Sequence, residues 1–255
     1  MAKSRGRQRP AGEGRTTNAV PASGRRAALG LILVVGLLGA VAWWFVRATP
    51  VAFPRSADQN VLLVTIDTLR ADALGCYGGA AATPALDALA RRGVRYDFAH
   101  AHAVVTLPSH ASILTGLFPY QHGIRDNNGY RLRSDTVTLA GTLKRAGFAT
   151  AAFVGAFPLD ARFGLPAGFD VYDDAYQESG RLAEFEMPER RADEVVALAR
   201  RWIATQQGKW FVWIHVYDPH ATYLPPPPFD AQYGSNPYLG EVAYTDHALA
   251  PLFAD

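Results

Sequence analysis

The sequence predicts an α/β fold, in which a mainly parallel sheet is sandwiched by helices and preceded by one N-terminal transmembrane helix. Two observations predict the sheet and its helices. Short apolar, β-branched runs such as residues 60–66 and 210–216 are typical of buried strands, and they alternate with segments that carry helix start and stop signals. A third observation predicts the membrane segment, because residues 27–46 contain no charged side chain.

The N-terminal part of the chain divides into a basic arm, an apolar segment and a linker. Residues 1–26 hold seven Lys or Arg residues against one acid and are rich in Gly, Pro, Ala, Ser and Thr, so we expect a disordered cytoplasmic arm. A helix over residues 27–46, at about 1.5 Å per residue, is long enough for a hydrocarbon core of roughly 30 Å. Trp43 and Trp44 suit the far interface, and residues 47–58 form a linker.

The basic arm favours an orientation with the N-terminus in the cytoplasm. We therefore expect a single-pass protein of the cell membrane with its folded domain outside the cytoplasm. A cleaved signal peptide is the main alternative, although its apolar region is usually only about 7–15 residues long. A helix buried in a soluble core is the other alternative.

Composition limits the class of protein. The 255 residues, 49% of them hydrophobic, suffice for one α/β domain with a core. A net charge of +2 does not indicate a nucleic-acid partner. Cys76 is the only cysteine, so no intrachain disulfide can form, and we interpret it as a small packed residue rather than a reactive thiol.

The remaining elements follow in order from the same signals. Residues 83–93 predict a helix, with Pro84 in its first turn and Gly93 after its end. Further helices are expected over residues 108–115, 136–146 and 188–207, and further strands over residues 94–105, 148–154 and 210–216. Residues 158–187 are expected to form a loop-rich segment that covers the site, and residues 225–228 a stiff, extended proline run.

A hydroxyl stands at the predicted start of the third helical segment, in the run 106–116. Thr106 precedes Pro108, which is tolerated in a first helical turn, and Gly116 follows the last apolar residue. Unpaired N–H groups and the positive end of the helix dipole would stabilise an alkoxide, a phosphate or a sulfate there. The alternative is an ordinary capped helix.

A carboxylate follows the first predicted strand. Asp67 comes directly after residues 60–66, at the strand end where open α/β sheets place ligand sites. A carboxylate in this position can bind a hard divalent cation, or it can simply cap a helix.

Together these segments resemble the sulfatase branch of the alkaline phosphatase superfamily. Residues 60–78 look like the family's first strand and metal-binding Asp, and residues 106–116 look like its nucleophile helix. Residues 215–223 resemble the later active-site loop, and residues 241–246 resemble the helix after it. The resemblance covers residues 59–255, and four motifs in family order are more specific than any one alone.

The resemblance implies roles for particular residues. Thr106 would be the nucleophile and Asp67 would bind a divalent ion that also contacts Thr106. His220 would exchange a proton with the leaving-group oxygen. Asn127 would donate to a substrate oxygen. His110, about one helical turn after Thr106, could bind substrate oxygens in place of the family's Arg or have only a surface role.

Other residues near these motifs are open to more than one interpretation. Arg125 could bind an anionic group or only pair with Asp126. His215 could contribute to the site or to the core. Asp218 could orient either histidine or cap the turn before Pro219.

Two departures from the family pattern affect the expected chemistry. True sulfatases of this family oxidise a Cys or Ser to formylglycine, which Thr106 cannot become, and His110 replaces the Arg that ends the motif. A Thr at this position resembles the superfamily's phosphotransferases and phosphodiesterases, in which the Thr alkoxide attacks phosphorus. The metal would be Ca²⁺ if the site is oxygen-rich, or Mn²⁺ or Zn²⁺ by resemblance to Thr-dependent members.

The family's second metal half-site, a Ser-Asp-His-Gly-type strand end, would follow the helix at Glu241, and the sequence reaches only Asp255. We therefore expect an N-terminal fragment or a truncated gene model. The leading hypothesis is a membrane-anchored metalloenzyme that hydrolyses or transfers sulfate or phosphate esters. The alternatives are a sulfatase that works without formylglycine, and a catalytically inactive binding or scaffold protein.

Overall fold

A computed structural model describes residues 22–46, 56, 58–176 and 188–254. The chain forms two compact units, residues 1–55 and 56–255. In the first unit, helix α1 (Ala22–Val46) contains the predicted segment 27–46. No helix within the described ranges is both long and apolar enough to cross a membrane. Residues 1–21 of the predicted arm, and 47–55 and 57 of the predicted linker, lie outside the described residues.

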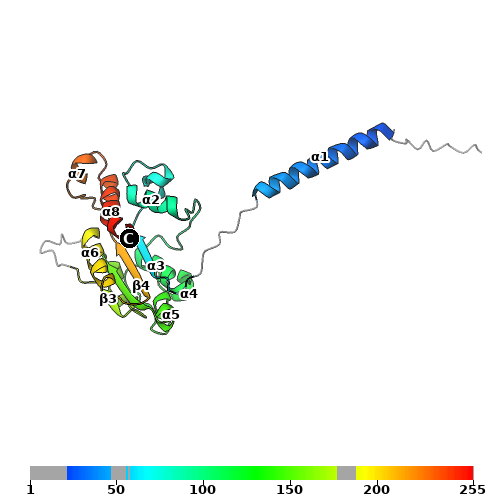
Figure 1. Ribbon diagram of the computed structural model, residues 1–255. Helices are drawn as coiled ribbons and strands as arrows, with labels where there is room; N and C mark the ends of the chain where they lie inside the picture. Colours follow the sequence, from blue (N-terminus) through cyan, green and yellow to red (C-terminus); the bar gives the residue numbers. More distant parts are fainter. Residues whose placement is uncertain (1–21, 47–55, 57, 177–187, 255) are drawn as a thin grey trace, which may run out of the picture. The chain divides into compact units, whose positions relative to one another are not determined.

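The second unit is built on a parallel sheet, which confirms the predicted fold class. Its strands are β1 (Val61–Ile66), β2 (Ala149–Val154), β3 (Val171–Asp173) and β4 (Trp210–Val216). They lie in the order β1-β4-β2-β3, and every neighbouring pair is parallel (Figure 1). The carboxyl ends of β1 and β4 therefore meet at one edge, where Asp67 and the loop after β4 follow.

Alternate residues of the strands contribute to two hydrophobic clusters, one on each face of the sheet. The first cluster joins Phe211 and Trp213 of β4 to Leu107 and Leu114 of helix α3 (Thr106–Thr115). The second joins Val212, Ile214 and Val216 of β4 to helices α6 (Ala192–Ile203) and α8 (Pro237–Phe253). Helices thus cover both faces, as the sequence predicts.

Shorter helices complete the described part of this unit. They are η1 (Ala71–Ala73), η2 (Gly75–Tyr77), α2 (Pro84–Arg92), α4 (Pro119–His122), α5 (Leu139–Arg145), η3 (Phe157–Leu159), η4 (Ala161–Phe163) and α7 (Phe229–Gln232). Helix α2 begins at Pro84 and is followed by Gly93, as expected. Helix α3 begins two residues earlier than expected, so that Thr106 is its first residue.

The predicted strand over residues 94–105 is wrong. Its apolar side chains are not buried, and Val104 is fully exposed. Arg95 pairs with Asp97, donates to the Cys76 carbonyl and lies over the Tyr77 ring, so this run is tied to η2 rather than to the sheet.

Two helices are shorter than their apolar patterns predict, because polar groups set their first turns. The Thr138 hydroxyl accepts a hydrogen bond from the Gly141 N–H at the start of α5. The Asp218 carboxylate accepts one from the Ala192 N–H at the start of α6. Within the predicted loop 158–187 the structure adds η4 and β3, and residues 177–187 lie outside the described part. The proline run ends in a turn, with Pro228 preceding α7.

Candidate active site

Asp67 lies where β1 leaves the sheet. Its backbone N–H still donates to the Val216 carbonyl at 3.1 Å, which continues the ladder with β4 by one residue. The next residue, Thr68, has a φ of 48°, a left-handed conformation that is unusual for a β-branched residue. This turn directs the Thr68 N–H onto Asp67 Oδ1 at 2.9 Å. Strain of this kind is typical of functional sites, where the surrounding contacts hold it in place.

Thr106 contacts the other oxygen of the same carboxylate. Its hydroxyl donates to Asp67 Oδ2 at 3.0 Å, across 39 residues of sequence. Thr106 also opens α3, so the hydroxyl stands at the positive end of the helix dipole. The structure therefore brings together the two residues that the sequence assigns to the nucleophile and the metal ligand.

Asn127 lies at the same helix end. Its Oδ1 accepts a hydrogen bond from the Leu107 N–H at 2.8 Å, so this side chain caps α3 beside Thr106. Asp126 accepts from the Asn127 N–H and shows no ion pair with Arg125 among the described residues. Arg125 is exposed, and it makes no hydrogen bond or ion pair with Asp67 or Thr106 in the described part of the chain.

His110 lies one helical turn after Thr106 and is only 5% exposed. Its Nδ1 is 2.7 Å from the Thr106 carbonyl oxygen, which can only accept, so Nδ1 carries the proton. Burial lowers the pKa of the imidazole, which favours the neutral ring. Nε2 then offers a lone pair and no N–H, so this arrangement does not support His110 as a cationic substitute for the family's Arg.

His215 is fully buried on β4, next to His110. The two rings pack edge to face, with centroids 4.6 Å apart. His215 Nε2 lies 3.8 Å from Asp67 Oδ2, and Nδ1 lies 3.0 Å from the Thr65 hydroxyl. Burial holds the pKa of His215 well below its usual value. His215 therefore lies beside Asp67 inside the core, and its complete burial does not indicate direct contact with a substrate.

His220 follows β4 in the loop that crosses the same sheet edge. Its ring stacks on Tyr217 at 4.2 Å, and Nδ1 donates to the Ala221 carbonyl at 2.7 Å. The proton on Nδ1 leaves Nε2 as the free acceptor of the ring. The Thr68 hydroxyl donates to the Pro219 carbonyl, so the residue before His220 is tied to the residue after Asp67.

The loop that carries His220 is held by residues that the sequence did not single out. Glu241 Oε1 accepts a hydrogen bond from the Leu224 N–H at 2.7 Å, and Arg191 donates to the Leu224 carbonyl at 2.9 Å. Asp218 caps α6 and lies 3.7 Å from Arg191, so it orients neither histidine. An acid within the mainly apolar helical run Pro237–Phe253 was the available signal for these contacts.

The Thr106–Asp67 pair fits part of a divalent-cation site. A carboxylate and a hydroxyl are oxygen donors of the kind that hard cations prefer, but Ca²⁺ takes about 6–8 oxygen ligands. No group of three or more His, Cys, Asp or Glu residues in the described part of the chain could hold a metal. The described residues therefore supply two adjacent donors and not a complete ligand set.

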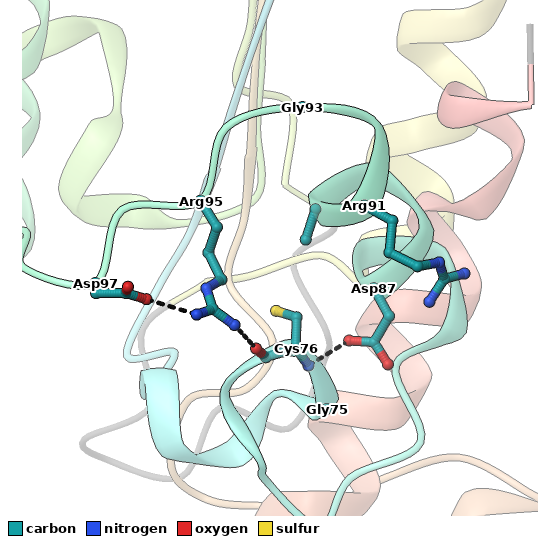
Figure 2. Close-up of a pocket in the computed structure, with 8 residues that line it drawn as sticks. Gly75, Cys76, Asp87, Arg91, Gly93, Arg95 and Asp97 are labelled. Carbon is teal, nitrogen blue, oxygen red and sulfur yellow. Dashed lines mark hydrogen bonds and ion pairs between the residues drawn. The ribbon is translucent and has the colours of Figure 1, made fainter. Parts of the chain in front are cut away.

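A pocket of about 470 Å³ lies elsewhere, over η2, α2 and the run after α2. Figure 2 shows Arg95 and Asp97 on one side of it, and Arg91 and Asp87 on the other. Burial and the nearby Asp87 raise the pKa of Cys76 in its wall, which keeps the thiol protonated and supports its interpretation as a packed residue. None of the residues assigned to catalysis lines this pocket.

Comparison with known proteins supports the resemblance to sulfatases at the level of sequence and of fold. The family model "Sulfatase" matches residues 59–255. The N-acetylglucosamine-6-O-sulfatase of Bacteroides thetaiotaomicron is 35% identical over 112 residues, which are 44% of this chain and 19% of that protein. Two solved structures share the fold. An alkaline phosphatase superfamily protein from Vibrio parahaemolyticus has a TM-score of 0.62 and 22% identity, over 79% of this chain and 51% of that one. The phosphonate monoester hydrolase of Agrobacterium radiobacter has a TM-score of 0.62 and 18% identity, over 76% of this chain and 58% of that one.

These matches differ in how much of each relative they span. The matched segment covers about a fifth of the curated sulfatase and between half and three fifths of the two solved chains. The family assignment therefore applies to residues 59–255, and statements about a whole enzyme go beyond the matched part.

Proposed function

The chain belongs to the sulfatase family, and we propose on that premise that residues 59–255 form the nucleophile-bearing part of a metal-dependent hydrolase or transferase of sulfate or phosphate esters. One observation carries the proposal: the Thr106 hydroxyl, at the start of α3, donates to Asp67 Oδ2 at 3.0 Å. A hydroxyl held by a carboxylate at a helix N-terminus has the surroundings that an attacking oxygen requires.

Each residue of the chain then has a distinct part in the reaction. Thr106 Oγ1 passes its proton to Asp67 Oδ2 and attacks the sulfur or phosphorus of the ester, and the bond from that atom to the leaving-group oxygen breaks. The positive end of the α3 dipole stabilises negative charge that develops on the substrate oxygens. The leaving-group oxygen takes a proton from Nε2 of His220, whose ring must carry protons on both nitrogens at this step, and Nε2 takes one back from the water or alcohol that displaces Thr106.

A divalent ion, when bound by Asp67 and Thr106, would lower the pKa of the hydroxyl and neutralise negative charge. Asp67 also holds the hydroxyl in place without the ion, because its other oxygen is fixed by the Thr68 N–H. The choice among Ca²⁺, Mn²⁺ and Zn²⁺ is part of the proposal, with Ca²⁺ first because both donors are oxygen atoms.

The identity of the ester depends on the residue at position 106. A Thr cannot form the aldehyde hydrate used by formylglycine sulfatases, so attack by the Thr alkoxide itself is the proposed step. Phosphate esters suit such an attack, and the phosphonate monoester hydrolase shares this fold. A sulfatase that works without formylglycine remains the alternative within the enzyme class.

We also propose that residues 27–46 anchor the protein in the cell membrane, with the catalytic domain outside the cytoplasm. The large apolar side chains described on α1 are exposed: Leu31, Ile32, Leu33, Val34, Val35, Leu37, Leu38, Val41, Trp43 and Trp44. A helix that is apolar on all sides needs an apolar environment. The seven basic residues that precede it support the orientation.

The nucleophile is tested with the full chain, bis(p-nitrophenyl) phosphate, p-nitrophenyl sulfate and each of the three metal ions. We expect nitrophenolate release that falls by at least about 10³-fold in Thr106→Ala, because loss of a nucleophile leaves only binding and electrostatic effects. The matched control is Thr205→Ala at the exposed end of α6, which should keep full activity. Equal activity of Thr106→Ala and the wild type would place the nucleophile elsewhere.

The same assay separates the enzyme from the scaffold alternative. A folded wild-type chain that releases no nitrophenolate with any of the three ions would favour a binding or scaffold role. The observation that makes this alternative worth testing is the ligand set, because the described residues do not complete a metal site.

A further inference from the structure

Three polar side chains beneath Asp67 form a continuous hydrogen-bonded series on one face of the sheet. Thr65 on β1 is in register with His215 on β4, and Trp213 stands two residues before His215 on the same face. The Trp213 indole N–H donates to Thr65 Oγ1 at 3.0 Å, and Thr65 Oγ1 lies 3.0 Å from His215 Nδ1. Trp213 and His215 are both fully buried.

The position of each proton in this series follows from the chemistry of the groups. An indole nitrogen can only donate, so Thr65 Oγ1 accepts from Trp213. The hydroxyl has one proton of its own, and His215 Nδ1 is its one acceptor within hydrogen-bond distance among the described residues. If Nδ1 accepts this proton, all three groups are satisfied, whereas a proton on Nδ1 would make Thr65 Oγ1 accept twice and leave its own proton without an acceptor.

We propose that Thr65 and Trp213 are positioning residues that fix the imidazole proton of His215 on Nε2, facing Asp67. Nε2 is 3.8 Å from Asp67 Oδ2, the same oxygen that accepts the Thr106 hydroxyl. At this distance the N–H attracts the carboxylate without forming a direct hydrogen bond. Nε2 has no hydrogen-bond partner in the described part of the chain.

The neighbouring His110 has the opposite tautomer, which shows that the two buried histidines need different hydrogen-bond partners to fix their protons. His110 carries its proton on Nδ1, which donates to the Thr106 carbonyl, and its Nε2 offers only a lone pair. The reverse tautomer of His215 would turn a lone pair toward the Asp67 carboxylate, which would repel it. The hydroxyl of Thr65 therefore selects the ring form that holds Oδ2 in position, while the Thr68 N–H holds Oδ1.

The importance of this arrangement for turnover rests on the proposed function, but the tautomer can be measured without turnover. The full chain, labelled with ¹⁵N in its histidine rings, is examined by long-range ¹H–¹⁵N correlation, and His215 is assigned by its loss in His215→Asn. We expect the Nε2–H form in the wild type and in Thr65→Ser, which keeps the hydroxyl. In the isosteric variant Thr65→Val we expect the proton to move to Nδ1 or to be shared between both nitrogens.

Two results would overturn the proposal. One is a wild-type His215 that carries its proton on Nδ1, which needs no variant to be observed. The other is an unchanged Nε2–H signal in Thr65→Val, or in Thr65→Ala if the valine variant does not fold. Failure of the proposed function is recognised separately, because Thr106→Ala would then keep its activity whatever the tautomer of His215.

Discussion

Glu241 is the residue whose ionisation most directly affects the active-site loop. It is 3% exposed, Oε1 accepts from the Leu224 N–H, and Oε2 has no hydrogen-bond partner among the described residues. Burial, together with the nearby Asp218 and Glu189, raises its pKa from the usual 4.5 to about 7, against the lowering effects of the Leu224 hydrogen bond and of Arg191. The folded chain therefore holds a proton between pH 4.5 and 7 that the unfolded chain releases.

This difference predicts how stability changes with pH. Because the pKa of an acid is raised on folding, the free energy of unfolding falls as pH rises from 4.5 to 7, and the loss is complete above pH 7. A shift from 4.5 to about 7 corresponds to about 3 kcal/mol. Glu241→Gln keeps the oxygen that accepts from Leu224 but cannot ionise, so we expect it to be more stable than the wild type at pH 8.

The comparison is made by chemical denaturation at pH 4.5, 6 and 8. The advantage of Glu241→Gln should shrink toward pH 4.5, and the control Glu194→Gln, an exposed acid on α6, should show no such change. An advantage that is the same at all three pH values would mean that Glu241 does not titrate in this range.

At the scale of one element, helix α3 sets the position of the nucleophile through both of its ends. Asn127 caps the first turn, and Gly116 ends the helix with a φ of 70°. A Cβ at Gly116 would meet no atom within 4 Å, so only the backbone conformation opposes a side chain there. In the left-handed region this costs about 1–2 kcal/mol for a residue other than glycine.

Gly116→Ala should therefore lower the free energy of unfolding by about 1–2 kcal/mol and the melting temperature by about 2–8 °C. Gly208→Ala is the matched control, because it also has open space around its Cβ but no positive φ. Thermal unfolding measures both. Equal melting temperatures of the two variants would show that the left-handed turn is not retained in solution.

Elements were predictable where local pattern and long-range packing agree. The runs 60–66 and 210–216 are apolar and β-branched, and both form strands, because the sheet buries them on its two faces. Residues 94–105 instead interleave apolar residues with Arg, Asp and His, and no strand forms there. Whether an apolar run joins the sheet depends on contacts such as that of Arg95 with Tyr77, which periodicity does not encode.

At the scale of the whole molecule, the sequence identified Asp67 and Thr106 as site residues but not the residues that hold them in position. Asp67 and Thr106 were recognisable because each ends or begins an element. The Thr65–Trp213–His215 series and the Glu241 contacts were not, because each joins side chains about 20 to 150 residues apart through hydrogen bonds. The roles of the site residues stay predictions until the variants are measured.

The N-terminal segment supplies the last prediction, because its free energy of insertion can be changed without touching the domain. Residues 27–46 contain eleven Leu, Ile, Val and Phe residues, each worth about 0.3–0.6 kcal/mol at the centre of a membrane helix, so together they favour insertion by a few kcal/mol. Two arginines at the centre would each cost about 2.5–3.5 kcal/mol and outweigh that gain. The double variant Leu33→Arg/Leu37→Arg should therefore leave the membrane fraction on alkaline carbonate extraction, whereas the wild type and the control Leu33→Ile/Leu37→Ile should stay in it. Release of the wild type by carbonate would contradict the anchor, and a wild-type chain that has lost its first residues would indicate a cleaved signal peptide instead.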